Sequence, residues 1–210
     1  TWTDLIPDLD VTSLAQRVVE FARTENTSEA PFAGSITFSD FSDAKDTAGW
    51  NAGYACESLR AGEDYIGFTN TMFVSLNTQD MPFSSIVNAF PYQRDLSICP
   101  VLTFHAYAVM LPDGVHEIQM KIILYSDCNY ISADYVIQGG TWNSIVFDAT
   151  NFSEIQHVDG IRILISGVDH TSIGDPLLIL SSIQARSFDH TTETMQSFIL
   201  QEQKHNTETS

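Results

Sequence analysis

From Ser35 onward, apolar and polar residues alternate with a period of two, in short runs separated by turn residues. The run 101–110 places Leu102, Phe104 and Ala106 on one side and polar or amphipathic residues on the other. Such alternation is typical of strands with one buried face. The other runs that are typical of strands cover residues 34–41, 64–70, 72–77, 85–90, 116–127, 134–138, 142–149, 158–167 and 176–187. Many short strands at this spacing predict an antiparallel β-sandwich.

Two segments outside these runs have helical rather than alternating periodicity. In residues 10–24 the apolar positions recur every three or four residues, and in the polar segment 188–210 a short stripe is formed by Met195, Phe198 and Ile199. We therefore divide the chain into a helix and linker (1–33), a β-sandwich domain (34–187) and a polar tail with a possible short helix (188–210). Within the sandwich, the runs 64–70 and 72–77 predict a hairpin that turns near Asn70 and Thr71.

The charge of the chain narrows the classes of molecule that it can bind. The chain carries 27 acidic and 9 basic residues, a net charge of −18, so nucleic acid and anionic membrane surfaces are poor partners and neutral ligands remain. Its apolar runs are too short to span a bilayer. Because the first residue is Thr1, we expect a processed or excised piece of a longer product. Three cysteines, Cys56, Cys99 and Cys128, fit no zinc spacing, and their pairing is left open.

Motifs for catalysis are missing from the sequence. Glycoside hydrolysis needs two carboxylates on one face, and Glu117 has no acidic partner two or four positions later. The six histidines are scattered, without an HxH or HExxH pattern, and the chain has no GxSxG sequence. We therefore expect no enzymatic activity.

Five motifs, in order, carry a resemblance to a known family. They are "ITFSDFSDAKDTAGW" (36–50), "RDLSICPVLTFHAYAV" (94–109), "IQMKIILYSD" (118–127), "GGTWNSIVFDATNF" (139–152), and "VDGIRILISG" followed by "PLLILSSIQA" (158–185). Together they resemble carbohydrate-binding modules with a galactose-binding-like jelly roll, over residues 34–187. The resemblance implies an all-β jelly-roll sandwich and implies that Trp142 has a structural role at the start of a strand.

The same resemblance raises the question of a structural calcium ion. Members of the group often hold calcium with carboxylates from the opening strand and from a closing strand. In this chain Asp40 is present at the opening, but Ser181 and Ser182 occupy the closing positions. Asp40, Asp43 and Asp46, with backbone carbonyls, are the remaining candidate ligands for such an ion. No other cofactor is expected.

Two surfaces are candidates for contact with a ligand. A sugar site needs exposed aromatic rings and planar polar groups. The period-two register turns five side chains outward, and they would line one surface if their strands share a sheet: His105, Tyr107, Lys121, Tyr125 and Arg162. The alternative for these five is an ordinary surface or a surface covered by the terminal helices. The second candidate surface is formed by two loops, one with Trp50, Asn51 and Tyr54 and one with Tyr92, Gln93 and Arg94. The alternative for Trp50 is a hydrophobic plug over the end of the sandwich.

The sequence therefore supports two hypotheses about function. The first is a non-catalytic carbohydrate-binding module that holds a neutral polysaccharide or oligosaccharide, within an extracellular or cell-surface protein of several modules. The alternative is a structural or assembly module of a cell-surface, fibre or capsid-like protein, which would use the same sandwich for contacts between proteins.

Overall fold

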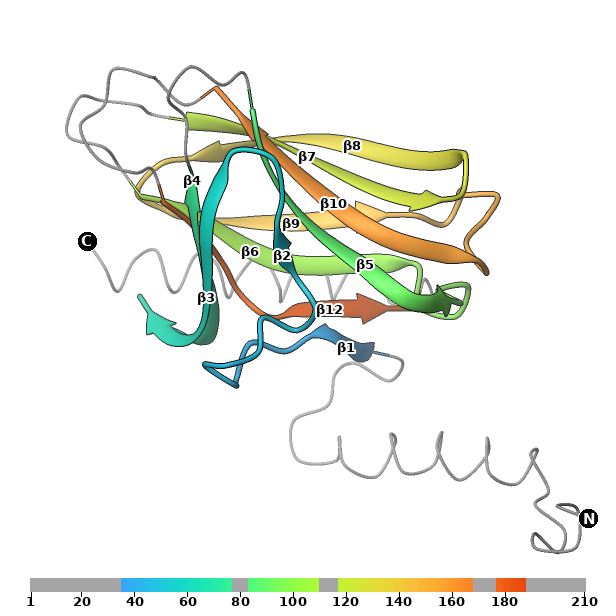
Figure 1. Cartoon of the computed structure of the whole chain (residues 1–210), viewed down its shortest axis with the longest axis horizontal. Coiled ribbons are helices and arrows are strands. Elements are labelled where there is room, and N and C mark those ends of the chain that lie inside the picture. The colour runs from blue at the N-terminus through green and yellow to red at the C-terminus, as the bar shows by residue number, and fades with distance from the viewer. Residues whose placement is uncertain (1–34, 77–82, 110–116, 168–176, 188–210) are drawn as a thin grey trace, which may run out of the picture. The chain divides into compact units, whose positions relative to one another are not determined.

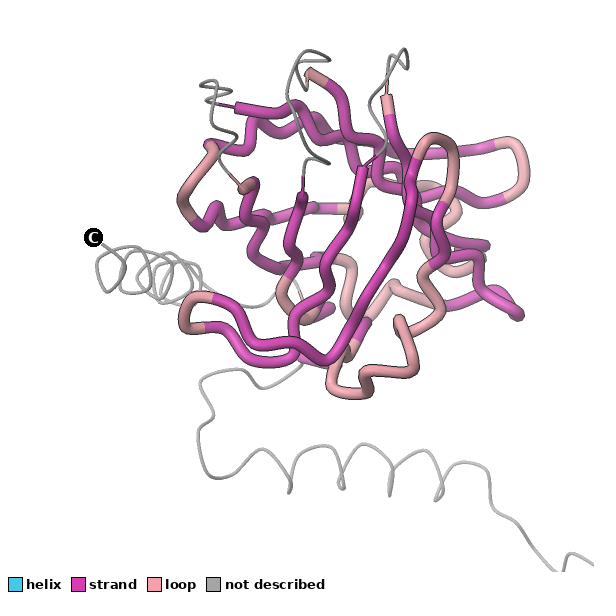
Figure 2. The backbone as a smooth tube through the Cα atoms, turned by 60° about the vertical axis from the view of Figure 1, so that its left-hand side comes forward, coloured by secondary structure: helices cyan, strands magenta, loops and turns pink. Residues whose placement is uncertain are grey.

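The computed structural model describes residues 35–76, 83–109, 117–167 and 177–187. The chain divides into two units, Thr1–Ala33 and Gly34–Ser210, and all described residues belong to the second. The helices expected in 10–24 and 188–210 lie outside the described residues. Within the described part, strands and the loops that join them make up the whole backbone (Figure 2).

The described residues form twelve strands in two antiparallel sheets (Figure 1). The seven-stranded sheet has the order β1-β12-β6-β11-β4-β3, with β9 on the free edge of β6, and the five-stranded sheet has the order β2-β5-β10-β7-β8. The strands are β1 (Ser35–Ser39), β2 (Asn51–Ala52), β3 (Cys56–Tyr65), β4 (Phe68–Leu76), β5 (Ser84–Arg94), β6 (Val101–Ala108), β7 (Glu117–Ser126), β8 (Asn129–Gln138), β9 (Trp142–Asp148), β10 (Val158–Ser166), β11 (Leu177–Leu180) and β12 (Ile183–Arg186). The predicted all-β antiparallel jelly-roll sandwich is confirmed.

The main core lies between the two sheets and follows the predicted alternation. On β7, Met120, Ile122 and Leu124 are buried, and on β10 every second residue from Ile161 to Ile165 is buried with them. The inward residues of β6 complete this core from the other sheet. Burial of one face of each strand fixes its register, because a slip of one residue would turn the apolar set outward.

A second apolar cluster lies on the outer face of the seven-stranded sheet. It consists of Phe73, Tyr107, Trp142 and Ile179, with partly buried side chains from the β3–β4 hairpin packed against it. This hairpin turns at Ile66 and Gly67, not near Asn70–Thr71 as the sequence predicted. Both turn residues have positive φ, 41° and 82°, which glycine adopts without strain. The "DYIG" segment (64–67) thus contains the end of β3 and the turn. The prediction that a strand begins there is wrong.

Trp142 belongs to this second cluster, as the first residue of β9. Its register partner is Tyr107 on β6, and its indole Nε1 donates a hydrogen bond to the carbonyl oxygen of Ile66 at 3.0 Å. The side chain is 0% exposed. The predicted structural role of Trp142 is confirmed, although it packs on the side of the sheet opposite to the main core.

Candidate functional site

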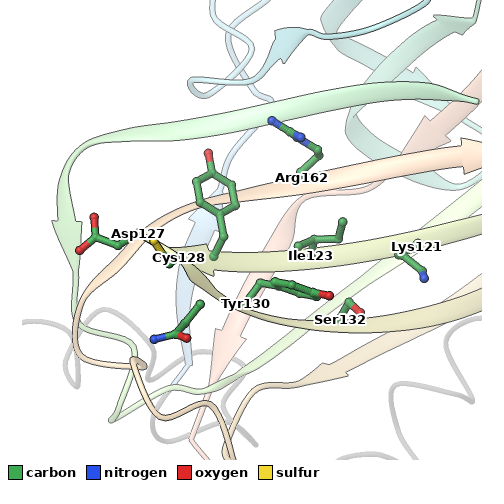
Figure 3. Close-up of a pocket in the computed structure, with 9 residues that line it drawn as sticks. Lys121, Ile123, Asp127, Cys128, Tyr130, Ser132 and Arg162 are labelled. Carbon is green, nitrogen blue, oxygen red and sulfur yellow. The ribbon is translucent and has the colours of Figure 1, made fainter.

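The outer face of the five-stranded sheet carries an open cavity of about 410 Å³. Figure 3 shows side chains of β7, β8 and β10 around it, with Tyr130 and Ser132 on one side and Arg162 on the other. Nine residues line the cavity: Lys121, Ile123, Tyr125, Asp127, Cys128, Asn129, Tyr130, Ser132 and Arg162. This lining combines two phenol rings with guanidinium, amide and hydroxyl groups.

The strand register explains why these side chains meet. Arg162 on β10 pairs with Ile123 on β7, which pairs with Ser132 on β8. Two residues further along β7, Tyr125 pairs with Tyr130 on β8. Residues directly opposite each other in antiparallel strands point to the same face, so both rows project outward, away from the buried residues between them.

Charges around the cavity are arranged in a few specific contacts. Lys121 Nζ lies 3.2 Å from Asp134 Oδ1 on the neighbouring strand, with both side chains largely exposed. Burial raises the pKa of Tyr125, the nearby guanidinium of Arg162 lowers it, and the carboxylate of Asp159 raises it. The Tyr125 phenol is therefore neutral at physiological pH and can both donate and accept a hydrogen bond.

The turn between β7 and β8 forms one end of the cavity. Asp127, which has a positive φ of 43°, and Cys128 connect the two strands. Asp159 holds this turn: its Oδ2 accepts a hydrogen bond from the backbone N–H of Asp127 at 2.6 Å, and its Oδ1 accepts one from Gln93 Nε2 at 3.1 Å. The start of β10 thereby fixes the turn that leads into Asn129 and Tyr130.

The five outward residues were expected to line one surface if their strands share a sheet. For Lys121, Tyr125 and Arg162 this condition holds: they share one outward face, and their contact with a ligand stays a prediction. For His105 and Tyr107 it fails, because β6 belongs to the other sheet. Both side chains do point away from the main core, but they are buried, Tyr107 within the second apolar cluster. His105 instead borders a separate hollow of about 230 Å³ on the seven-stranded sheet.

In the second predicted surface, the loop with Trp50 and Tyr54 is not a joint platform. Of the two alternatives for Trp50, ligand contact or a buried hydrophobic plug, the structure agrees with the buried one: its side chain is 2% exposed and packs in the main core, and its Nε1 donates a hydrogen bond to Ser39 Oγ at 3.0 Å. A ring so buried offers no face to a ligand. Tyr54 is exposed, with its ring 5.0 Å from that of Phe83, and it does not line the cavity.

The sequence reasoning missed the cavity residues contributed by β8 and its turn. Tyr130, which is 68% exposed, and Ser132 follow Asp127-Cys128-Asn129 directly. The strand was expected to begin only at Asp134, so Tyr130 was assigned to a loop. The signal was present in the turn-forming residues Asp127 and Asn129, which follow an alternating strand and predict a tight hairpin.

The carboxylates proposed for calcium are used within their own loop. Asp40 Oδ1 accepts a hydrogen bond from the backbone N–H of Ser42 at 3.0 Å, and Asp43 Oδ1 accepts one from the N–H of Lys45 at 2.8 Å. Among the described residues, no group of three or more His, Cys, Asp or Glu side chains is placed to hold a metal ion. Asp46, the third candidate carboxylate, is used in the same way: its Oδ1 accepts a hydrogen bond from the backbone N–H of Ala48 at 2.9 Å.

The three cysteines have different environments, and each is a thiol rather than half of a disulfide. Cys99 is buried and Cys56 is half-buried, whereas Cys128 is exposed at the rim of the cavity. Burial raises the pKa of Cys56 to about 11. Within the described ranges, no helix is long and apolar enough to cross a membrane.

Comparisons with known proteins gave matches to solved structures alone. A scan against protein-family models and a search of curated proteins found no match. Two agarases match at TM-scores of 0.56 and 0.58 and identities of 16% and 12%; 73% and 75% of this chain is covered, but only 24% and 25% of theirs. This chain therefore spans about a quarter of the length of these enzymes.

Single modules of similar size match over nearly their whole length. The family 11 carbohydrate-binding module of a cellulosomal cellulase from Clostridium thermocellum matches at a TM-score of 0.51 and 15% identity, covering 76% of this chain and 98% of the module. A family 28 module specific for non-crystalline cellulose matches at 0.52 and 11%, covering 75% and 97%. The chain therefore has the β-sandwich fold of these carbohydrate-binding modules, which part of the two agarases shares.

Proposed function

We propose that this chain is a non-catalytic carbohydrate-binding module that holds a neutral polysaccharide or oligosaccharide in the cavity on the five-stranded sheet. The observation that carries the proposal is the lining of that cavity. Tyr125 and Tyr130 provide rings for the apolar C–H faces of a sugar, and Arg162, Asn129 and Ser132 provide hydrogen-bonding groups for its hydroxyls. Such a combination is typical of sites that orient a ligand by a few polar groups on an apolar base.

The shape and charge of the site support a neutral chain molecule. The cavity is open, so a long ligand can enter and leave it from the side. The protein as a whole carries a net charge of −18, which repels polyanions. Carbohydrate binding also agrees with the fold, since one of the matched family 11 structures contains a β-1,3-1,4-mixed-linked tetrasaccharide. Fold similarity alone does not assign function, so the proposal rests on the cavity.

The experiment is affinity electrophoresis of the purified protein in gels that contain mixed-linkage β-1,3-1,4-glucan, a soluble cellulose derivative, xylan, agarose or starch. We expect at least one neutral glycan to retard the wild type. Tyr130→Ala is expected to weaken binding by about 1 to 2 kcal/mol, roughly fivefold to thirtyfold, because it removes one stacking ring. The matched control is Tyr92→Ala. Tyr92 is also an exposed tyrosine (84% exposed), lies on β5 and does not line the cavity.

Two results would contradict the proposal. If no glycan of the panel retards the wild type, carbohydrate binding is refuted for these ligand classes. If Tyr92→Ala and Tyr130→Ala weaken binding equally, the ligand does not use the cavity. Release of reducing ends from the bound glycan during incubation would contradict the non-catalytic part of the proposal.

The alternative, a structural or assembly module, depends on the expected terminal helices, and these lie outside the described residues. It predicts a stable oligomer, so the mass of the full chain by size-exclusion chromatography with light scattering distinguishes the two functions. A monomer that binds glycan supports the proposed module. We further propose an extracellular or cell-surface location, as part of a protein of several modules, because polymeric glycans are encountered there.

A further inference from the structure

One residue on the sheet face that carries the cavity has no side chain. Gly160 on β10 belongs to an outward-facing row: it pairs with Ala89 on β5 and with Tyr125 on β7, and Tyr125 pairs with Tyr130 on β8. The row therefore has two tyrosines at one end and two small residues at the other. No large side chain of this row stands above β10.

The phenol of Tyr125 occupies the space above Gly160. A Cβ atom built on Gly160 would lie 2.3 Å from Tyr125 Oη and 2.6 Å from its Cζ, far inside normal van der Waals contact, and 2.7 Å from the backbone carbonyl oxygen of Asn88 on β5. Because Tyr125 belongs to β7 and Gly160 to the adjacent strand, the side chain must lean across β10 instead of standing upright from the sheet. The hydroxyl end of the phenol therefore lies over the backbone of Gly160, while Tyr125 also lines the cavity.

We propose that Gly160 is a positioning residue of this site: the missing side chain seats the Tyr125 ring across β10, so that the ring forms the floor on which a glycan lies. This inference rests on the proposed function. Backbone strain does not explain the glycine, because its φ is outside the positive range that the structure records for Gly49, Gly62, Gly67, Gly140 and Gly167. The close approach of the Tyr125 phenol and of the Asn88 carbonyl oxygen is what demands a residue without a Cβ.

The first test is Gly160→Ala, measured by affinity electrophoresis on the glycan of the five-member panel that retards the wild type most. The new methyl group pushes the phenol upward, so we expect binding to weaken about tenfold, comparable to the loss of one aromatic contact. Gly53→Ala is the matched control: its Cβ would lie 2.4 Å from Ser85 Oγ and 2.8 Å from the Ser85 carbonyl oxygen, so it is similarly crowded, but its crowded neighbour Ser85 does not line the cavity, whereas the neighbour of Gly160, Tyr125, does. We expect Gly53→Ala to lower thermal stability and to keep wild-type affinity.

A double-mutant cycle with Tyr125→Ala separates positioning from general damage. If Gly160 acts through the ring, Gly160→Ala weakens binding in the wild type but has no further effect once the ring is absent. Equal losses in both backgrounds, or wild-type affinity of Gly160→Ala, would overturn the inference while leaving the proposed function intact. If Tyr125→Ala binds like the wild type, or no glycan retards the wild type, the failure belongs to the proposed function and the role of Gly160 falls with it.

A second measurement needs no ligand and no substitution at Gly160. A ring held against Gly160 shifts the resonances of its α-protons through the ring current in the NMR spectrum. We expect this shift in the wild type and in Tyr125→Phe, and its loss in Tyr125→Ala. Unshifted α-protons in the wild type would overturn the seating of the ring directly.

Discussion

Trp142 is the residue whose removal gives the sharpest test of the packing described above. Its ring centroid lies 4.5 Å from that of Phe68, 5.4 Å from that of Tyr107 and 6.3 Å from that of Tyr65, and the side chain has no exposed area. It joins β9, β6 and the β3–β4 hairpin on the outside of the seven-stranded sheet. Trp142→Ala would leave these rings around an unfilled space.

The expected loss can be worked out from the buried area. A tryptophan buries about 150–250 Å², which at ~25 cal/mol per Å² gives roughly 4–6 kcal/mol as an upper value. Measured truncations of buried aromatic residues cost about 3–5 kcal/mol, because the surroundings partly collapse. We therefore expect Trp142→Ala to lower the free energy of unfolding by about 4 kcal/mol. Trp142→Phe keeps a ring but loses the hydrogen bond to Ile66, so it should cost about 1–2 kcal/mol.

The assay is urea unfolding followed by far-UV circular dichroism, with Tyr92→Ala as an exposed control that should change stability by less than about 0.5 kcal/mol. If Trp142→Ala does not fold, Trp142→Phe still carries the test. A loss below about 1 kcal/mol for the alanine variant would refute the reasoning, since it would mean that the second cluster is not a packed core. Glycan affinity of the folded Trp142→Phe variant should equal that of the wild type, because the cavity lies on the other sheet.

Two further predictions follow from perturbed side chains. At pH 8, Ellman's reagent should modify the exposed Cys128 quickly and Cys56 slowly, because burial raises the pKa of Cys56 to about 11 and keeps it a thiol; equal rates for the two would contradict this. Burial likewise raises the pKa of Tyr135 from 10.0 to about 12, so its stabilising contribution is complete below pH 10 and is lost as the pH rises to 12. Free energies of unfolding measured across this interval should fall more steeply for the wild type than for Tyr135→Phe, and parallel curves would contradict the assignment.

The fold could be predicted from the sequence because burial imposes a period of two on the strands. The inward sides of β6, β7 and β10 are correct residue by residue, since an apolar face is needed wherever two sheets meet. The β3–β4 turn was missed because Ile66 is a poor indicator of a turn, and only Gly67 beside it favours the positive φ that the chain adopts there.

The candidate site could be predicted only within one strand at a time. Register determines that Tyr125 and Arg162 point outward, but not which strands share a sheet, and this pairing depends on long-range contacts. His105 and Tyr107 therefore were grouped with a surface on the opposite side of the sandwich. Trp50 was left open between ligand contact and a buried plug because it lies in a polar, glycine-containing loop. Ser39 supplies the hydrogen-bond partner that lets the indole N–H be buried, and the composition of the loop does not reveal this contact.

The unequal covering of the two sheets has a consequence for protein engineering. In the described residues, both faces of the seven-stranded sheet take part in apolar packing. The outward side chains of β7, β8 and β10 that line the cavity belong to neither apolar cluster. Ile123, Ser132 and Arg162 can therefore be substituted without a rearrangement of the hydrophobic core. A combinatorial library could be confined to these three positions, with the Tyr125–Gly160 contact retained. The protein would then serve as a scaffold in which ligand preference is varied separately from folding.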